Sequence, residues 1–370
     1  MGVLLLAGCG RMDVIIDSDA NAELDDQHAI AYTVLNVNSF RVLGITVNAT
    51  SGGGSVEDNA EEAGRVLALC GRAGRGIEVF RGAAGKYDEI YVSPVEKVAP
   101  DSAAASTSAS SATSSAASTS ASPAASPATS SAASTSASPA TASAAACGTT
   151  VLEDNYDGKE AVQFILRRSR HYSQRRPLTI IAIGKLTDIA LAIAADPGLA
   201  RRIRVVWAGT GYPAGGEFNL LEDTAAANAV MASDVPLEIL PARYGLPSGT
   251  WAVRVKRDSV LAGWEGLGPR VPPVEGRHGG TFERFGEYSC DLFRHIRVGS
   301  DESRSLFDLT APAILKNPAW GHRSEIPASE FIDGYWYPLD GPHRTVTLWE
   351  DFDKEAILGD FLTTLSASGN

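Results

Sequence analysis

The sequence predicts an α/β fold in which a doubly wound, mostly parallel sheet carries helices on both faces. Three observations support this prediction: short apolar runs alternate with helical patterns, several of the runs are apolar throughout, and polar residues gather where the runs end. Continuous apolar strands are typical of parallel sheets buried on both faces. Regular alternation of strands and helices favours the same architecture.

Each element is expected from its own pattern. The first β-branched run, residues 14–16, reads as a buried strand, and Ser55 followed by Asp58 comes close to a capping box at the start of a helix. The expected strands are residues 14–16, 41–47, 77–80, 178–183, 203–207 and 237–240. The expected helices are residues 28–36, 55–71, 159–173, 186–195, 224–233 and 307–315.

Two later regions are expected to differ from this alternation. Residues 247–299 are richer in Gly, Pro and Arg, which predicts helices and loops over the rim of the sheet. Residues 335–339 and 345–349 are expected to be strands that join late in the chain, as an antiparallel addition.

Composition excludes several classes of protein. The 370 residues include 32 Lys and Arg and 44 Asp and Glu, a net charge of −12, and no basic stripe suggests a groove for nucleic acid. The four cysteines are widely spaced without a CxxC pair, so neither a zinc site nor a disulfide framework is indicated. No apolar stretch reaches the length of a membrane span.

The expected organisation is one domain with two appended features. Residues 1–11 contain an apolar stretch that ends at Cys9 and resembles a lipoprotein signal, although the segment is short and has no Lys or Arg before its apolar part. A true translation start near Met12 explains the segment equally well. Residues 102–146 contain only Ser, Ala, Thr and Pro, which predicts a disordered insertion because such residues bury too little to offset chain entropy. Residues 12–370 are otherwise expected to form a single domain that this insertion interrupts.

Four aspartates crowd the first strand-to-helix turn: Asp17, Asp19, Asp25 and Asp26. Carboxylates at the end of one strand repel one another unless a cation or a substrate hydroxyl resolves the repulsion. An acidic helix cap is the simpler alternative, because Asp is favoured in a first helical turn. The number of acids, with two on the strand side, favours a metal or polyol site.

Two further motifs follow this acidic turn in order. Residues 182–191 read Ala-Ile-Gly-Lys-Leu-Thr-Asp-Ile-Ala-Leu, and residues 217–223 read Glu-Phe-Asn-Leu-Leu-Glu-Asp before an Ala-rich helix. Together the three resemble the inosine-uridine preferring nucleoside hydrolases, which carry a DxDxxxDD turn, a TGPLTNIA segment and an EFNxxxD segment. The resemblance covers nearly all of the chain outside residues 1–11 and 102–146.

The resemblance implies a doubly wound α/β domain that hydrolyses the N-glycosidic bond of a ribonucleoside with the help of bound Ca²⁺, as in purine and pyrimidine salvage. It implies carboxylate ligands at Asp19, Asp26 and Asp308 and a main-chain carbonyl ligand at Ile183. Calcium takes six to eight hard oxygen ligands, so these residue types suit it. An ordinary helix cap is the alternative for Asp308.

The same resemblance assigns the remaining roles. Asp19 is the expected base that takes a proton from the attacking water, and Asp25 is expected to bind a ribose hydroxyl. Glu217 and Asn219 match the residues that hold the ribose from the opposite side, although Glu217 could also be a solvated loop carboxylate. Asp17 is expected to orient the turn and not to touch the metal.

The sequence departs from the family pattern at the acidic turn. The segment between Asp19 and Asp25 is two residues longer than usual, so that Asn21 and Glu23 occupy new space, and Glu23 is expected to face solvent. Asn48 follows the second strand in place of the family's Gly-Asn and is a candidate for a polar role near the substrate and metal.

A second departure concerns the departing base. Phe307 stands where purine-acting members often carry a His that protonates the base. His278 and Tyr288 are the substitutes that we consider, with a structural hydrogen bond as the alternative for His278. His28 lies among apolar residues on the first helix and is expected to be structural.

Two other functions fit parts of the pattern. Asp17-Ser-Asp19 after a strand also suits the nucleophile of a magnesium phosphatase of the haloacid dehalogenase type, which does not need Asp25, Asp26 or the Glu217 segment. The missing His leaves open a ribose or nucleoside binder without catalysis. The expected partner is a small nucleoside, and no nucleic acid is expected to bind. The chain is expected to form a homo-oligomer. Its expected location is cytoplasmic, or lipid-anchored if Cys9 is a lipoprotein cysteine.

Overall fold

A computed structural model describes residues 10–91, 152, 155–339 and 344–369. The chain divides into two units, one formed by Met1–Val92 with Leu152–Asn370 and the other by Ser93–Val151. The second unit, which contains the predicted insertion at 102–146, lies outside the described residues, as does Cys9 in the predicted N-terminal segment 1–11. The elements and the site described below belong to the first unit.

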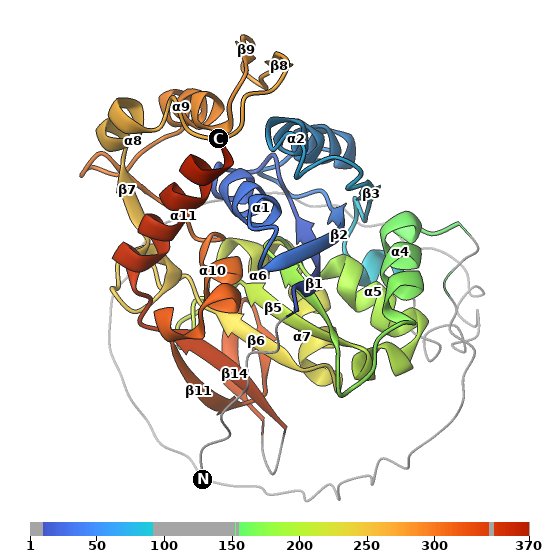
Figure 1. Ribbon diagram of the computed structural model, residues 1–370. Coiled ribbons are helices and arrows are strands. Elements are labelled where there is room, and N and C mark those ends of the chain that lie inside the picture. Colours follow the sequence, from blue (N-terminus) through green and yellow to red (C-terminus); the bar gives the residue numbers. More distant parts are fainter. Residues whose placement is uncertain (1–9, 92–151, 153–154, 340–343, 370) are drawn as a thin grey trace, which may run out of the picture. The chain divides into compact units, whose positions relative to one another are not determined.

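The centre of the first unit is an eight-stranded sheet (Figure 1) in the order β11-β14-β6-β5-β4-β1-β2-β3. Seven strands run parallel and only β11 is antiparallel to its neighbour. The strands are β1 Met12–Ser18, β2 Phe40–Val47, β3 Val79–Arg81, β4 Leu178–Ala182, β5 Ile203–Ala208, β6 Leu237–Leu240, β14 Thr345–Glu350 and β11 His322–Pro327. The predicted fold class is therefore confirmed.

Helices cover both faces of the sheet, and each face has its own hydrophobic core. Successive side chains of β1 point to opposite faces of the sheet, so Val14 and Ile16 belong to one core and Ile15 belongs to the other. The first core contains side chains of α1 Asp25–Leu35, α2 Val56–Leu69, α8 Arg257–Gly263, α9 Phe285–His295, α10 Thr310–Lys316 and α11 Lys354–Ser368. The second contains side chains of α4 Lys159–Ser169, α5 Thr187–Ala195 and α7 Thr224–Ala232.

Short elements complete the unit. Within the part of the chain that the structure describes, the remaining helices are α3 Tyr87–Ile90 and α6 Phe218–Glu222, with 3₁₀ segments at Pro197–Arg201, Thr250–Ala252 and Pro318–Trp320. Three two-stranded sheets pair β7 Arg254–Lys256 with β10 Ser303–Ser305, β8 Val274–Glu275 with β9 Thr281–Phe282, and β12 Ser329–Ile332 with β13 Tyr335–Pro338. The rim region 247–299 thus holds short strands in addition to the predicted helices and loops.

The prediction of a late antiparallel addition is wrong for one of its two strands. β14 joins the main sheet parallel to β6, while β13 pairs antiparallel with β12 in a sheet of its own. The antiparallel strand of the main sheet is β11, whose residues alternate between exposed and half-buried and so lack the apolar signal of an interior strand.

The chain order places a switch point between β1 and β4. From β1 the chain proceeds outward to β2 and β3, and it then returns to the other side of β1 to build β4, β5 and β6. In open α/β sheets, ligands bind at such a point, beyond the carboxyl ends of the strands. Among the described helices, none combines the length and the apolar character needed to cross a membrane.

Candidate active site

The acidic turn presents its carboxylates to the site and does not use them as helix caps. Helix α1 begins at Asp25, three residues earlier than predicted, and its cap residue is Leu24, which forms no side-chain cap hydrogen bond. Asp25 and Asp26 therefore occupy the first turn as buried carboxylates without a capping role. The simpler alternative of an acidic helix cap does not describe this turn.

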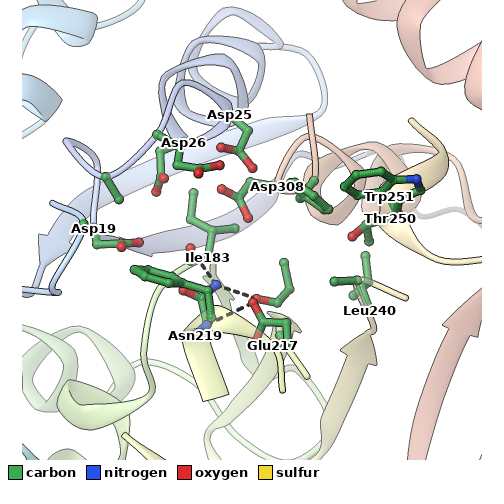
Figure 2. A pocket seen from close by; sticks show the side chains of 18 of the residues that line it. Asp19, Asp25, Asp26, Ile183, Glu217, Asn219, Leu240, Thr250, Trp251 and Asp308 are labelled. Carbon is green, nitrogen blue, oxygen red and sulfur yellow. Dashed lines mark hydrogen bonds between the residues drawn. The ribbon is translucent and has the colours of Figure 1, made fainter. Parts of the chain in front are cut away.

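A cavity of about 300 Å³ opens beyond the carboxyl ends of β1, β4 and β5. One wall is acidic, with Asp19, Asp25, Asp26 and Asp308 (Figure 2). The opposite side carries Leu240, Thr250 and Trp251 in Figure 2, together with Tyr244 and Phe307. The cavity is thus divided between an acidic half and a largely aromatic half.

Three carboxylates converge in the acidic half. Asp25, Asp26 and Asp308 each offer an oxygen, and these oxygens lie within 4.8 Å of one another. The pKa of Asp25 is raised to about 7, mainly by burial and in part by the charge of Asp19. Burial, with the charges of neighbouring aspartates added, also holds the pKa values of Asp26 and Asp308 well above the ordinary range. Such a cluster is costly to ionise without a cation.

Asp19 lies beside this cluster and is held from one side. The Thr50 hydroxyl donates a hydrogen bond of 2.6 Å to Asp19 Oδ2. Burial raises the pKa of Asp19 to about 6, and the hydrogen bond from Thr50 opposes that rise. The Ser18 hydroxyl likewise donates a hydrogen bond of 2.6 Å to Asp26 Oδ1. Both carboxylates are therefore oriented by a hydroxyl at the end of a strand.

Glu217 and Asn219 form the floor of the cavity on the β4 and β5 side. The Glu217 carboxylate accepts the backbone N–H groups of Thr210, Asn219 and Leu220 at 2.7–3.0 Å and caps α6. Burial raises the pKa of Glu217 to about 7 although these three hydrogen bonds oppose the rise. The Asn219 amide donates to the carbonyl oxygens of Ile183, at 3.3 Å, and Ala208, at 2.9 Å.

The donor set of the acidic half fits a hard divalent cation. The predicted metal ligands all line the same cavity, and all of their ligand atoms are oxygens. They are the carboxylates of Asp19, Asp26 and Asp308 and the main-chain carbonyl predicted at Ile183. A Cβ at Gly184 would lie 3.0 Å from Asp19 Oδ1, so the chain after Ile183 approaches this carboxylate closely, with little room for a side chain. The group whose carboxylates converge closely enough to hold a metal ion is Asp25, Asp26 and Asp308, so it includes Asp25 where the sequence predicts Asp19.

Asp308 lies in this set without serving as a helix cap. Helix α10 begins at Thr310, and its cap residue is Leu309 with no side-chain cap hydrogen bond. The side chain of Asp308 is buried against the acidic cluster. The alternative reading of Asp308 as an ordinary cap is thus not supported.

The cavity contains an aromatic wall and a cation, neither of which the sequence singled out. Tyr244, Trp251 and Phe307 pack against one another with ring centroids 5.7–5.9 Å apart. Arg304, on β10, is the only residue with a positively charged side chain among the described residues that line the cavity. It forms an ion pair with Glu23, which is half-exposed at the rim and not simply solvated as predicted.

Several predicted residues do not line the cavity. Asn48 lies behind it, and its amide donates to Asp17 Oδ1 at 3.1 Å and to the Lys185 carbonyl at 3.3 Å. Asp17 accepts this bond and one from Thr46, which agrees with an orienting role. A direct substrate contact by Asn48 is therefore not supported in this structure.

The histidines and Tyr288 are also placed elsewhere. His278 pairs with Asp291 at 3.1 Å and is not among the residues that line the cavity. Tyr288 donates to buried Glu62 at 2.6 Å. His28 is buried and hydrogen-bonded to Ser289 at 2.7 Å, and burial lowers its pKa to about 4, as befits a structural histidine. Neither substitute for the family's His acid reaches the cavity.

The residues that the sequence did not reveal fall into two groups. Ser18 and Thr50 are polar residues close to strand ends, so their position carried a signal. Arg304, Tyr244 and Trp251 come from short irregular elements of the rim, where no periodic pattern predicts which side chain turns inward.

Buried carboxylates beyond the strand ends at the switch point of a parallel α/β sheet form a site of the kind that can bind a small ligand and an oxygen-bound cation. The family model of the inosine-uridine preferring nucleoside hydrolases matches residues 14–336. The chain therefore belongs to this family, and the resemblance inferred from the three motifs is confirmed, together with the class of hydrolases acting on N-glycosyl compounds.

Individual relatives are distant. The chain is 34% identical over 121 residues, 31% of its length, to an uncharacterized protein of Schizosaccharomyces pombe, and it spans only 37% of that protein. Among solved structures it resembles a plant nucleoside hydrolase at 15% identity and a TM-score of 0.64, covering 97% of this chain and 100% of that one. A purine-preferring ribonucleoside hydrolase from Gardnerella vaginalis gives 16% identity and a TM-score of 0.58, with 96% and 98% covered. These structural likenesses bear on the fold.

Proposed function

We propose that the protein hydrolyses the N-glycosidic bond of ribonucleosides, releasing ribose and the free base, with Ca²⁺ bound by Asp19, Asp26, Asp308 and the Ile183 carbonyl. The observation that carries this proposal is the single cavity that joins a buried set of oxygen donors to an aromatic wall. A ribose beside the carboxylates places its base against Tyr244 and Trp251, because the two halves are adjacent.

The residues of the acidic half support the chemistry of N-glycoside cleavage. The transition state carries positive charge on the ribose, which a dense group of carboxylates stabilises. Asp19 takes a proton from water, the water oxygen bonds to the anomeric carbon, and the electron pair of the N-glycosidic bond leaves with the base. Bound Ca²⁺ supplies Lewis acidity that makes a neighbouring water more acidic and holds hydroxyl groups.

The ribose is held from two sides in this proposal. Asp25 accepts a ribose hydroxyl on the α1 side, and Glu217 and Asn219 contact it from the β5 side. The backbone hydrogen bonds to Glu217 fix its carboxylate before the substrate arrives, so little ordering entropy is lost on binding. The homo-oligomer and the cytoplasmic location expected from the sequence stay predictions.

The test is an assay of the purified full-length protein against a panel of purine and pyrimidine ribonucleosides, measuring release of reducing sugar. We expect turnover that a chelator abolishes and that added Ca²⁺ restores. Binding of nucleosides without turnover would instead favour the non-catalytic binder, and hydrolysis of phosphate esters alone would contradict both ribose functions.

Arg304 supplies the cavity with a group that can assist the departing base. A guanidinium donates hydrogen bonds without losing its proton, so it stabilises electron density on a ring nitrogen or carbonyl oxygen of the base. Its ion pair with Glu23, one of the residues that lengthen the acidic turn, keeps it at the rim. This arrangement offers an alternative to the proton donor that Phe307 displaces.

We expect Arg304→Gln to lower kcat for natural nucleosides by about 10²-fold. The loss should shrink to a few fold for p-nitrophenyl riboside, whose leaving group needs no help. Arg167→Gln, which changes an exposed arginine of α4, is the matched control. Equal losses on both substrates would show that Arg304 does not act on the leaving group.

A further inference from the structure

A second cluster of ligating side chains lies outside the cavity, between the β8–β9 hairpin and α9. His278 of the hairpin and Asp291 and His295 of α9 each offer one ligand atom, and the three atoms lie within 4.8 Å of one another. His278 Nδ1 is 3.1 Å from one oxygen of Asp291, and His295 Nδ1 is 3.4 Å from the other. The two imidazole centroids are 4.1 Å apart.

The backbone holds these three groups together without the aid of a ligand. Asp291 and His295 are separated by one helical turn, so their side chains lie on the same face of α9. The hairpin loop closes through hydrogen bonds from Gly276 N to Gly280 O and from Gly279 N to Gly276 O, with Gly279 and Gly280 at positive φ. His278 is therefore presented to α9 by a tight loop.

The chemistry of this cluster differs from that of the acidic site. Two imidazoles and one carboxylate suit Zn²⁺, Co²⁺, Ni²⁺ or Cu²⁺, whereas Ca²⁺ and Mg²⁺ prefer all-oxygen donors. Asp291 is largely buried, with 13% of its side chain exposed, while His295 is 48% exposed. The cluster is thus anchored on one side and open to solvent on the other, which leaves room for a water as a fourth ligand.

We propose that His278, Asp291 and His295 form a binding site for a divalent transition-metal ion, separate from the calcium site. The hairpin that carries it also contacts the acidic turn, because Arg277 donates to the Asn21 carbonyl at 2.9 Å and to Asn21 Oδ1 at 3.3 Å. Metal bound to His278 therefore fixes the segment that supports this turn. The site does not depend on the proposed hydrolase activity.

The test is a titration of the Ca²⁺-saturated, full-length protein with Co²⁺, followed by its visible absorption bands. We expect one Co²⁺ per chain and displacement by Zn²⁺. His278→Asn and His295→Ala should each weaken Co²⁺ binding by at least about tenfold, since even the loss of a second-layer partner of a metal ligand costs that much. Circular dichroism of each variant checks that the fold is retained.

Two control variants decide which histidines bind. His171→Ala removes an exposed histidine at the end of α4, and His322→Ala removes one near Glu350 and Asp351, which form another exposed group of ligating atoms. Both should bind Co²⁺ as the wild type does. Loss of binding in His322→Ala with retention in His278→Asn, or octahedral Co²⁺ spectra unchanged in every histidine variant, would overturn the proposal.

Amide hydrogen exchange provides a second readout of the same site. Zn²⁺ should slow exchange in residues 274–282 of the wild type, because the metal joins the hairpin to α9. The His278→Asn variant should show no such protection. Protection that persists in this variant would contradict the assignment of His278.

Discussion

Asparagine in place of Asp19 is expected to lower the rate of ribose release by about 10²–10⁴-fold, the range that general-base catalysis contributes. Asparagine has nearly the shape of aspartate and still accepts the hydrogen bond from Thr50, but it cannot take a proton from water. Since the change also removes one of several buried, mutually repelling charges, stability should not fall.

The measurement is kcat with saturating Ca²⁺, compared with Asp333→Asn as the matched control. Asp333 is exposed in the β12–β13 turn at a φ of 50°, a conformation that asparagine adopts readily. This control should behave as the wild type. An Asp19→Asn enzyme within threefold of the wild-type kcat would remove Asp19 from the role of base.

The second large effect concerns stability without metal. Asp25 has a pKa of about 7 in the folded chain and about 4 when unfolded. Between these values the folded state binds more protons than the unfolded state, so the free energy of unfolding falls as pH rises. From about pH 5 to about pH 8, the ionisation of this single group should lower the free energy of unfolding by roughly 2–3 kcal/mol.

A comparison of variants tests the contribution of Asp25 together with the effect of its charge on Asp26 and Asp308, whose pKa values it helps to raise. His28 acts in the opposite direction between about pH 4 and pH 6.5, because its pKa is lowered in the folded state, but it is common to the wild type and Asp25→Asn. Denaturant unfolding of both proteins in chelator should therefore show the wild type losing stability relative to Asp25→Asn as pH rises.

Addition of Ca²⁺ should reverse this loss of stability. At a free Ca²⁺ concentration of 100 times Kd, binding raises the free energy of unfolding by about 2.7 kcal/mol. The reversal should be largest above about pH 7, where the carboxylates are ionised and bind the cation best. Parallel pH profiles for the wild type and Asp25→Asn in chelator would show that Asp25 is not the group responsible.

The sequence was most informative where strands are buried on both faces. The strands at 178–183 and 203–207 and the capping box of Ser55 and Asp58 appear in the structure close to their predicted bounds. The acidic wall was foreseeable for the same reason, because the ends of parallel strands meet at one edge. The first helix begins earlier than predicted because its first helical turn contains Asp25 and Asp26, and the sequence pattern assigns these acidic residues to the preceding loop.

The aromatic half was not foreseeable. His278 was considered because of its residue type, yet its loop turns the ring toward α9, and a sequence does not reveal the direction of a side chain in a glycine-rich hairpin. Arg304 lies on a three-residue strand whose partner, β7, is 47 to 51 residues away in sequence. Such long-range pairing of short segments carries little local pattern.

Phe307 and Asp308 are neighbours in sequence but belong to different halves of the cavity. Asp308 joins the carboxylates, whereas Phe307 packs on Tyr244 and Trp251. In the proposed function, a substitution at position 307 alone would change the wall that faces the base, while Asp308 would stay with the oxygen donors of the cation. The contacts to the base and those to the cation could then change independently, one substitution at a time.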